Sequence, residues 1–204
     1  MKKILLTAAS ATLVAVVATN TYGQAQVNFS NVGNAITYGA NTGTNQGLAL
    51  YGSAGTYEYG LYIGAFGSTS ISQMQLVDTV LSLNSTAGGG FAGVINSGTI
   101  NSPGNTANTI NFNSSTEYSF IVAAWTAASG STYAAAYATP GSYVGLSAIG
   151  NFTPGPGGTS PAAQAFGSQA GQITTFSIAP VPEPTTLALG GLGAAALLLF
   201  RRRK

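Results

Sequence analysis

Short runs in which apolar and polar residues alternate recur between residues 26 and 180. Alternation with a period of two places successive side chains on opposite faces of a β-strand. The clearest run is Glu117–Ala127 (EYSFIVAAWTA), and both of its faces are largely apolar. Because a strand that is apolar on both faces is covered on both, this run predicts a central strand.

Other alternating runs predict further strands. In Tyr57–Phe66 (YEYGLYIGAF) every second residue from Tyr57 to Ile63 shares one face, and in Gln73–Leu83 (QMQLVDTVLSL) every second residue from Met74 to Val80 does so. Shorter runs predict the remaining strands: Val27–Phe29, Ala35–Tyr38, Leu48–Tyr51, Gly90–Ile95, Thr109–Phe112, Tyr133–Tyr137, Ser142–Ala148 and Ile173–Ile178.

Clusters of Gly, Asn, Ser and Pro separate these runs, as at Ala87–Gly90 and Asn101–Asn105, and predict turns. Pro161–Phe166 predicts a single helical turn. Many short strands at intervals of roughly 8–12 residues predict an all-β fold with a single β-sandwich or jelly-roll-like domain. A β-solenoid is the alternative, although the sequence shows no regular repeat period.

The N-terminal segment has the three parts of a secretory signal peptide. Met1–Lys3 is basic, Ile4–Ala18 is apolar, and Thr19–Ala25 (TNTYGQA) is rich in small residues. Gly23 and Ala25 place small side chains at positions −3 and −1, so we expect cleavage between Ala25 and Gln26, with cleavage after Gly23 as the alternative. The apolar part is short for a membrane span of ~20 residues, which disfavours a permanent N-terminal anchor.

The C-terminal segment joins a carboxylate between two prolines to an apolar stretch and a basic end. Pro182-Glu183-Pro184 precedes Leu187–Phe200 (LALGGLGAAALLLF), and the chain closes with four basic residues, Arg201, Arg202, Arg203 and Lys204. Fourteen helical residues rise ~21 Å, which is short against a ~30 Å hydrocarbon core. We expect a transmembrane helix whose basic end stays cytoplasmic.

This three-part arrangement resembles the PEP-CTERM sorting signal of Gram-negative bacteria. The resemblance covers about residues 180–204, where tripeptide, short span and basic end occur in the order and spacing of that family. It implies recognition of Pro182-Glu183-Pro184 by an exosortase, a membrane transpeptidase that removes the span, in bacteria that produce exopolysaccharide and biofilms. Members share the signal and not the body. Val27–Asn31 (VNFSN) also resembles the start of anonymous exported bodies that carry this signal.

The sequence therefore divides into a signal peptide (1–25), an exported β-rich domain (26–180) and a sorting signal (181–204). All six Lys and Arg lie within four residues of an end of the chain. Without residues 1–25 and 185–204, no base remains against four acids, Glu58, Asp78, Glu117 and Glu183, which gives a formal charge of −4. A domain without Lys or Arg has no basic face for nucleic acid, which excludes that class of partner.

Composition also excludes most catalytic chemistry. The chain has no His and no Cys, which excludes a Ser-His-Asp triad, a cysteine nucleophile and a Cys/His zinc site. A glycosidase would need two carboxylates ~5–9 Å apart, and the three in the body are far apart in sequence. We expect no catalytic residue, no metal site and no cofactor.

Aromatic residues remain as candidates for ligand binding. One interpretation is a sugar-stacking face, for which Tyr57, Tyr59 and Tyr62 are the candidates because the first two flank Glu58. The other interpretation, which we favour, is that the aromatic side chains fill the core, above all Trp125 in its central strand.

Two functions from different classes follow. The first is a structural protein of the cell surface or extracellular matrix, sorted by an exosortase and associated with exopolysaccharide or biofilm. The second is a carbohydrate-binding module for the cell's own exopolysaccharide. Both imply the secretion machinery and an exosortase as partners, a precursor anchored in the inner membrane, and a final location at the cell surface or in the matrix.

Overall fold

The computed structural model describes residues 25–31, 33–40, 42–83, 85–102, 113–156, 161–183 and 190. Strands dominate this part of the chain and its helical elements are short, so the prediction of a β-rich fold is confirmed. The strands are β1 (Ala25–Ser30), β2 (Thr37–Tyr38), β3 (Tyr57–Ala65), β4 (Gln75–Leu81), β5 (Asn96–Ser102), β6 (Tyr118–Thr126), β7 (Tyr143–Leu146), β8 (Gly150–Phe152), β9 (Ala163–Gln164) and β10 (Ser177–Pro180). The helical elements are the 3-10 turns η1 (Gly43–Asn45), η2 (Ile71–Gln73) and η3 (Ala127–Ser129) and the α-helix α1 (Tyr133–Tyr137).

The larger sheet has the strand order β2-β10-β7-β6-β3-β4, and β8 also pairs with β6. At its centre, β3 and β6 are antiparallel over their whole length, from Tyr57 opposite Thr126 to Ala65 opposite Tyr118. β6 has partners on both edges, and neighbouring residues that point to opposite faces, such as Val122 and Ala123, are both fully buried. The prediction of a central strand in Glu117–Ala127 is confirmed.

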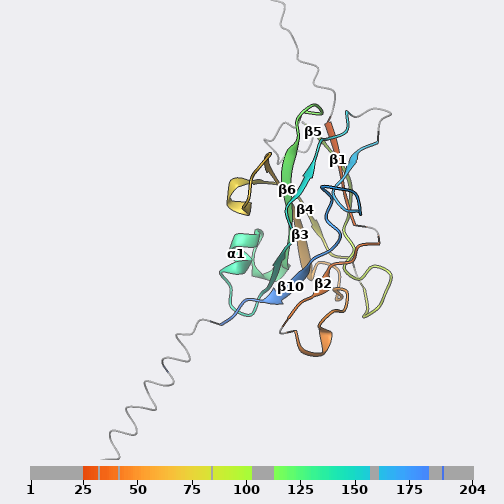
Figure 1. The fold of residues 1–204 in the computed structure, drawn as a ribbon. Coiled ribbons are helices and arrows are strands. Elements are labelled where there is room, and N and C mark those ends of the chain that lie inside the picture. The colour runs from red at the N-terminus through yellow and green to blue at the C-terminus, as the bar shows by residue number, and fades with distance from the viewer. Residues whose placement is uncertain are drawn as a thin grey trace, which may run out of the picture.

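The smaller sheet has the order β5-β1-β9, in which β1 is antiparallel to β5 and parallel to β9. Val27 and Phe29 of β1 lie in one hydrophobic cluster with Leu61 of β3 and Val122 of β6. The two sheets therefore share one core, which we call the inter-sheet core. Figure 1 shows β1 on one side of the central strands and α1 on the other.

A second cluster covers the opposite face of the larger sheet. Trp125 is fully buried there, and its Nε1 donates a hydrogen bond to the carbonyl of Gly130 at 2.9 Å. The indole ring lies over Gly60 of β3, where a Cβ atom would approach two of its ring carbons to 2.9 Å. Ala136 of α1 is buried in the same cluster, so α1 closes this face. We call this group the Trp125 cluster.

Tyr133–Tyr137, predicted as a strand, is instead the helix α1. Thr132 caps its beginning, because its side chain accepts a hydrogen bond from the backbone N–H of Ala135 at 3.2 Å. The three alanines between the tyrosines are strong helix formers. Tyr133 and Tyr137, which share a strand face in the prediction, also meet at the i,i+4 spacing of a helix.

The strand prediction also fails where pairing partners are distant in sequence. Gly90–Ile95 forms turns, and β5 begins only at Asn96 and runs into the predicted turn Asn101–Asn105. Pairing with β1 supplies the hydrogen bonds that stabilise this Gly- and Asn-containing strand. The same pairing makes Ala163–Gln164 a strand where a helical turn was predicted. Leu48–Tyr51 contributes an isolated bridge at Ala49, and Thr109–Phe112 lies outside the described residues.

β4 departs from strict alternation because it contains a β-bulge. Consecutive residues Leu61 and Tyr62 of β3 pair with Asp78 and Leu76, which leaves Val77 as the extra residue. As a result Leu76 packs against the Trp125 cluster while Val80 packs against the inter-sheet core. The prediction that Met74 to Val80 share one face is therefore wrong.

β1 begins and β10 ends at opposite ends of the molecule (Figure 1). The strand register agrees, since Gln26 bridges to Gly155 near β8 at one end and Pro180 pairs with Tyr143 at the other. Among the described residues, no helix is long and apolar enough to cross a membrane. The predicted span Leu187–Phe200 lies outside these residues except for Gly190.

Candidate functional site

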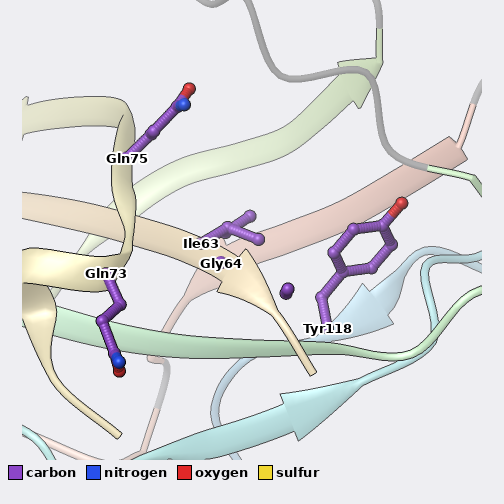
Figure 2. A pocket seen from close by; sticks show the side chains of 6 residues that line it. Ile63, Gly64, Gln73, Gln75 and Tyr118 are labelled. Atoms are coloured by element: carbon purple, nitrogen blue, oxygen red, sulfur yellow. The ribbon is translucent and has the colours of Figure 1, made fainter. Parts of the chain in front are cut away.

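A pocket of about 240 Å³ opens where β3 ends and where β4 and β6 begin. The residues that line it are Ile63, Gly64, Ala65, Gln73, Gln75 and Tyr118 (Figure 2). The strand register brings them together, because Ile63 lies opposite Gln75 and Ala65 lies opposite Tyr118. This end of the larger sheet is the one remote from the end of β10, where the sorting signal begins.

The pocket lining is uncharged and partly rigid. Figure 2 shows Ile63 and the ring of Tyr118 turned toward the same space, whereas the side chains of Gln73 and Gln75 point in opposite directions. Gln73 Oε1 accepts hydrogen bonds from the backbone N–H groups of Thr69 (2.7 Å) and Ser70 (3.2 Å), which fixes it in the capping box of η2. Gln75 is exposed and is therefore the adaptable amide of the pocket.

An apolar floor, one aromatic ring and neutral amides suit a small uncharged ligand. The volume lies below the roughly 300 Å³ at which pockets for drug-sized ligands begin, so only a small ligand would fit. Sequence reasoning missed this pocket, because its residues meet only through the pairing of β3 with β6, which lie far apart in the chain. The two glutamines at the start of the 73–83 run were the one available signal.

The three tyrosines predicted to bind a glycan lie in the two hydrophobic clusters. Tyr57 and Tyr59 are 6% and 1% exposed in the inter-sheet core, and Tyr62 is 9% exposed in the Trp125 cluster. A sugar stacks on an open ring face, and these three rings present none. Their burial supports the other interpretation, in which aromatic side chains fill the core.

Tyr57 and Tyr59 belong to a group of buried phenols around Tyr38. The hydroxyl oxygens of Tyr38 and Tyr57 are 2.7 Å apart, and the rings of Tyr51, Tyr57 and Tyr143 meet the Tyr38 ring edge-on. Burial raises the pKa of both the Tyr57 and Tyr59 hydroxyls above 10.0, and the hydrogen bond with Tyr38 raises the pKa of Tyr57 further. The fold therefore favours the neutral form of both hydroxyls, and that of Tyr57 is hydrogen bonded to Tyr38.

Open aromatic faces occur elsewhere. Phe66 directly follows the pocket residue Ala65 and is largely exposed, and Tyr137 of α1 is 59% exposed. The Tyr137 ring stacks on Tyr133 with centroids 5.9 Å apart and an interplanar angle of 30°. Tyr137 therefore offers a matched comparison for any binding role of the pocket.

The three carboxylates of the body do not meet. Glu58 lies opposite Trp125, whereas Glu117 precedes Tyr118 at the far end of the same strand pair, roughly 26 Å away. Asp78 lies opposite Leu61, which faces the inter-sheet core, and Glu58 is on the other face of the sheet. Within the described residues, no three His, Cys, Asp or Glu side chains gather that could hold a metal ion.

The beginning of the sorting signal is joined tightly to the body. β10 ends at Pro180, and after Val181 the residues Pro182 and Glu183 are exposed. The backbone N–H of Val181 donates to the carbonyl of Ser142 at 2.7 Å, and the carbonyl of Val181 accepts from the N–H of Gly141 at 3.2 Å. Pro184 and the basic cluster Arg201–Lys204 lie outside the described residues.

The predicted signal-peptide cleavage site lies within β1. Ala25 is the first residue of β1 and is fully buried in the inter-sheet core. The backbone N–H of Gln26 donates to the carbonyl of Gly155 at 2.8 Å. Cleavage between Ala25 and Gln26 would remove a core residue, whereas the alternative cleavage after Gly23 would keep it.

Residues 180–204 match a family model described as the PEP-CTERM protein-sorting motif. The resemblance found in the sequence is therefore confirmed. The chain carries this motif, which makes it a substrate of an exosortase and an exported protein with a C-terminal membrane anchor before processing. The match covers the C-terminal segment and not the body. No curated protein and no solved structure matches the chain.

Proposed function

We propose that this chain is a structural protein of the cell surface or extracellular matrix that associates with exopolysaccharide. The observation that carries the proposal is that the sorting motif follows directly on a two-sheet domain with its own hydrophobic core. Two sheets around one core favour a β-sandwich, and removal of the membrane span would leave that domain as the exported product.

Charge and the placement of carboxylates support a structural role over a catalytic one. Glu58, Asp78 and Glu117 are kept apart by the larger sheet, and this separation supports a structural role over the carboxylate pair of a glycosidase. The sequence has no Lys or Arg between Lys3 and Arg201. A domain without cations attracts no acidic polymer by charge, and its contacts with a neutral polysaccharide would be insensitive to salt.

Cell fractionation tests this proposal. The wild-type chain is compared with a variant in which Pro182, Glu183 and Pro184 are replaced by alanine. We expect wild-type protein in the extracellular polymer fraction, where it stays through a wash with 1 M salt, and the variant in the membrane fraction. A wild-type chain that is found entirely in the culture medium would contradict the association with the matrix.

A second candidate function, binding of a neutral carbohydrate, is favoured by the pocket at the end of the sheet. The pocket combines the Tyr118 ring with neutral amides and contains no charged side chain. It lies at the end of the larger sheet remote from the sorting signal, so it would face away from the membrane in the anchored precursor. A neutral hexose fits this lining better than a uronic acid, which would lack a cation.

Affinity electrophoresis in gels that contain neutral polysaccharides tests the second candidate. Tyr118→Ala and Gln75→Ala remove pocket groups, and Tyr137→Ala is the matched control because it removes an exposed ring elsewhere. We expect the pocket variants to lose retardation and the control to keep it. Loss in Tyr137→Ala alone would assign binding to α1, and a wild-type protein without retardation would eliminate this candidate.

A further inference from the structure

The sorting motif and the folded body overlap. The family model matches from residue 180, whereas β10 ends at Pro180 and Val181 is still hydrogen bonded to the body. The first two residues of the motif are therefore part of the fold, and Pro182 is the first one free of it. In sequence, Pro180-Val-Pro182-Glu-Pro184 is a continuous series with proline at every second position.

Several contacts hold the end of β10, which is labelled in Figure 1, in the larger sheet. Ala179 lies opposite Val144 and Pro180 lies opposite Tyr143. Beyond the strand, Val181 exchanges two backbone hydrogen bonds with Gly141 and Ser142, at 3.2 and 2.7 Å. We call these two hydrogen bonds the Val181 clasp. While the clasp is closed, the backbone of Val181 is unavailable to another protein.

The anchored body has little room above the membrane. Leu187, the start of the apolar span, is six residues after Val181. Even a fully extended chain would bridge only about 22 Å over this distance, and the headgroup layer takes up roughly 5–8 Å of it. A membrane enzyme that binds an extended peptide on both sides of its cleavage point must therefore work against the folded domain.

An unsatisfied hydroxyl lies beside the clasp. Ser142 is 4% exposed, and its Oγ has no hydrogen-bond partner. Among the described residues, the one other buried side-chain oxygen or nitrogen without a partner is Asn28 Oδ1. A buried polar atom without a partner costs free energy in the closed state. Opening the clasp would expose this hydroxyl to water, which offsets part of the cost of breaking the two hydrogen bonds.

We propose that the exosortase reads Pro180 and Val181 together with Pro182-Glu183-Pro184, and that opening of the Val181 clasp precedes processing. The opening step is non-covalent: two backbone hydrogen bonds to Gly141 and Ser142 break, and hydrogen bonds to the enzyme replace them, as in addition of a β-strand. The specificity of processing then depends on how easily this end of the body opens as well as on the tripeptide.

A disulfide lock tests the proposal in the full-length chain. Val144→Cys with Ala179→Cys joins residues directly opposite in β7 and β10, whose Cα separation in an antiparallel pair, ~4.5–5.5 Å, suits a disulfide. The chain has no cysteine of its own. Glu58→Cys with Leu81→Cys is the matched control, because it joins opposite residues of β3 and β4 away from the clasp.

The readout is the ratio of processed protein to membrane-bound precursor. We expect the β7–β10 lock to lower this ratio by about tenfold or more and the control lock to leave it unchanged. Ser142→Ala removes the unsatisfied hydroxyl and should stabilise the closed clasp, which lowers the rate of processing by about fivefold. An unchanged ratio in the β7–β10 lock would overturn the proposal.

A second variant separates access from misfolding. In the β7–β10 lock, the eight residues Gly-Ser-Gly-Ser-Gly-Ser-Pro-Val are inserted between Val181 and Pro182, which places a free copy of Pro-Val before the tripeptide. We expect processing to return to the wild-type ratio. If the insertion does not restore processing, the arrest does not come from restricted access to Pro180 and Val181, and the proposal is wrong.

Discussion

Replacement of Gly60 by alanine should destabilise the body, because the Trp125 ring occupies the space that the new methyl group needs. A Cβ atom on Gly60 would lie 2.9 Å from two carbons of the indole ring and 3.0 Å from Leu76 Cδ1. Carbon atoms in contact prefer about 3.5–4.0 Å, so each neighbour must move by roughly 0.5 Å or more. Trp125 is fully buried and hydrogen bonded to Gly130, which limits such movement.

The expected loss can be worked from these contacts. Overpacking in a well-filled core costs about 1–3 kcal/mol. Alanine also lowers the conformational entropy of the unfolded chain, which stabilises the folded state by about 0.4–1 kcal/mol and offsets part of this loss. We therefore expect the free energy of unfolding to fall by about 1–2 kcal/mol and Tm to fall by about 2–8 °C for a domain of this size.

Urea unfolding followed by fluorescence measures this change, because Trp125 is the one tryptophan of the chain. Gly90→Ala is the control, since a Cβ atom there meets nothing within 4 Å, and it should change the stability by less than about 0.5 kcal/mol. Trp125→Phe removes the two ring carbons that the new methyl group would meet. Unfolding followed by circular dichroism should therefore show that the Gly60→Ala, Trp125→Phe double variant loses about 1 kcal/mol less free energy of unfolding than the sum of the two single variants. An unaffected Gly60→Ala protein, or strict additivity, would refute the reasoning.

Three further predictions concern titration, processing and proteolysis. The raised pKa of Tyr57 and Tyr59 means that the folded protein favours the neutral phenols. Their contribution to stability is therefore fully present below pH 10 and is lost as the pH rises above it. A fraction of the tyrosines should accordingly ionise only as the protein unfolds above pH 10. Tyrosinate absorbance of the exported protein checks this. Nine of the ten tyrosines remain once the signal peptide with Tyr22 is removed, and ionisation of all nine near pH 10 in a folded protein would contradict the prediction. N-terminal sequencing of the exported protein should begin at Gln24, because buried Ala25 belongs to β1, and a start at Gln26 would contradict this. Trypsin should leave the mass of the processed protein unchanged, because Lys and Arg are absent between Lys3 and Arg201, whereas chymotrypsin should cut it once it is unfolded. A small loss of mass on trypsin treatment, from trimming at Lys2, Lys3 or Arg201–Lys204, would show that a basic end is retained.

The strands that could be predicted are those with long apolar alternation. β3 and β6 carry nearly continuous apolar residues, so their central place follows from burial alone. β5 and β9 could not be predicted, because their residues apart from Ile100 are polar or small and become strands only by pairing with β1 from elsewhere in the chain. The bulge at Val77 is likewise a property of the strand pair, and it places Leu76 and Val80, predicted to share a face, on opposite faces of the sheet.

The same limit applies to the sites. The sorting signal is a continuous segment with a fixed order of parts, so sequence alone identified it. Tyr57 and Tyr59 were candidates for a binding face because they flank Glu58, but residues two apart in a strand share a face, and here that face is the inter-sheet core. The pocket with Tyr118 is formed by strands that are distant in sequence, and nothing local marks it.

Export with removal of both terminal signals is tested most directly by the intact mass of the protein recovered from the extracellular polymer. We expect a mass that lacks the N-terminal signal peptide and that ends between Val181 and Thr186, and the protein should be acidic because only carboxylates remain charged among its side chains. A mass that includes Arg201–Lys204 would contradict processing by the exosortase and would leave a plain membrane anchor.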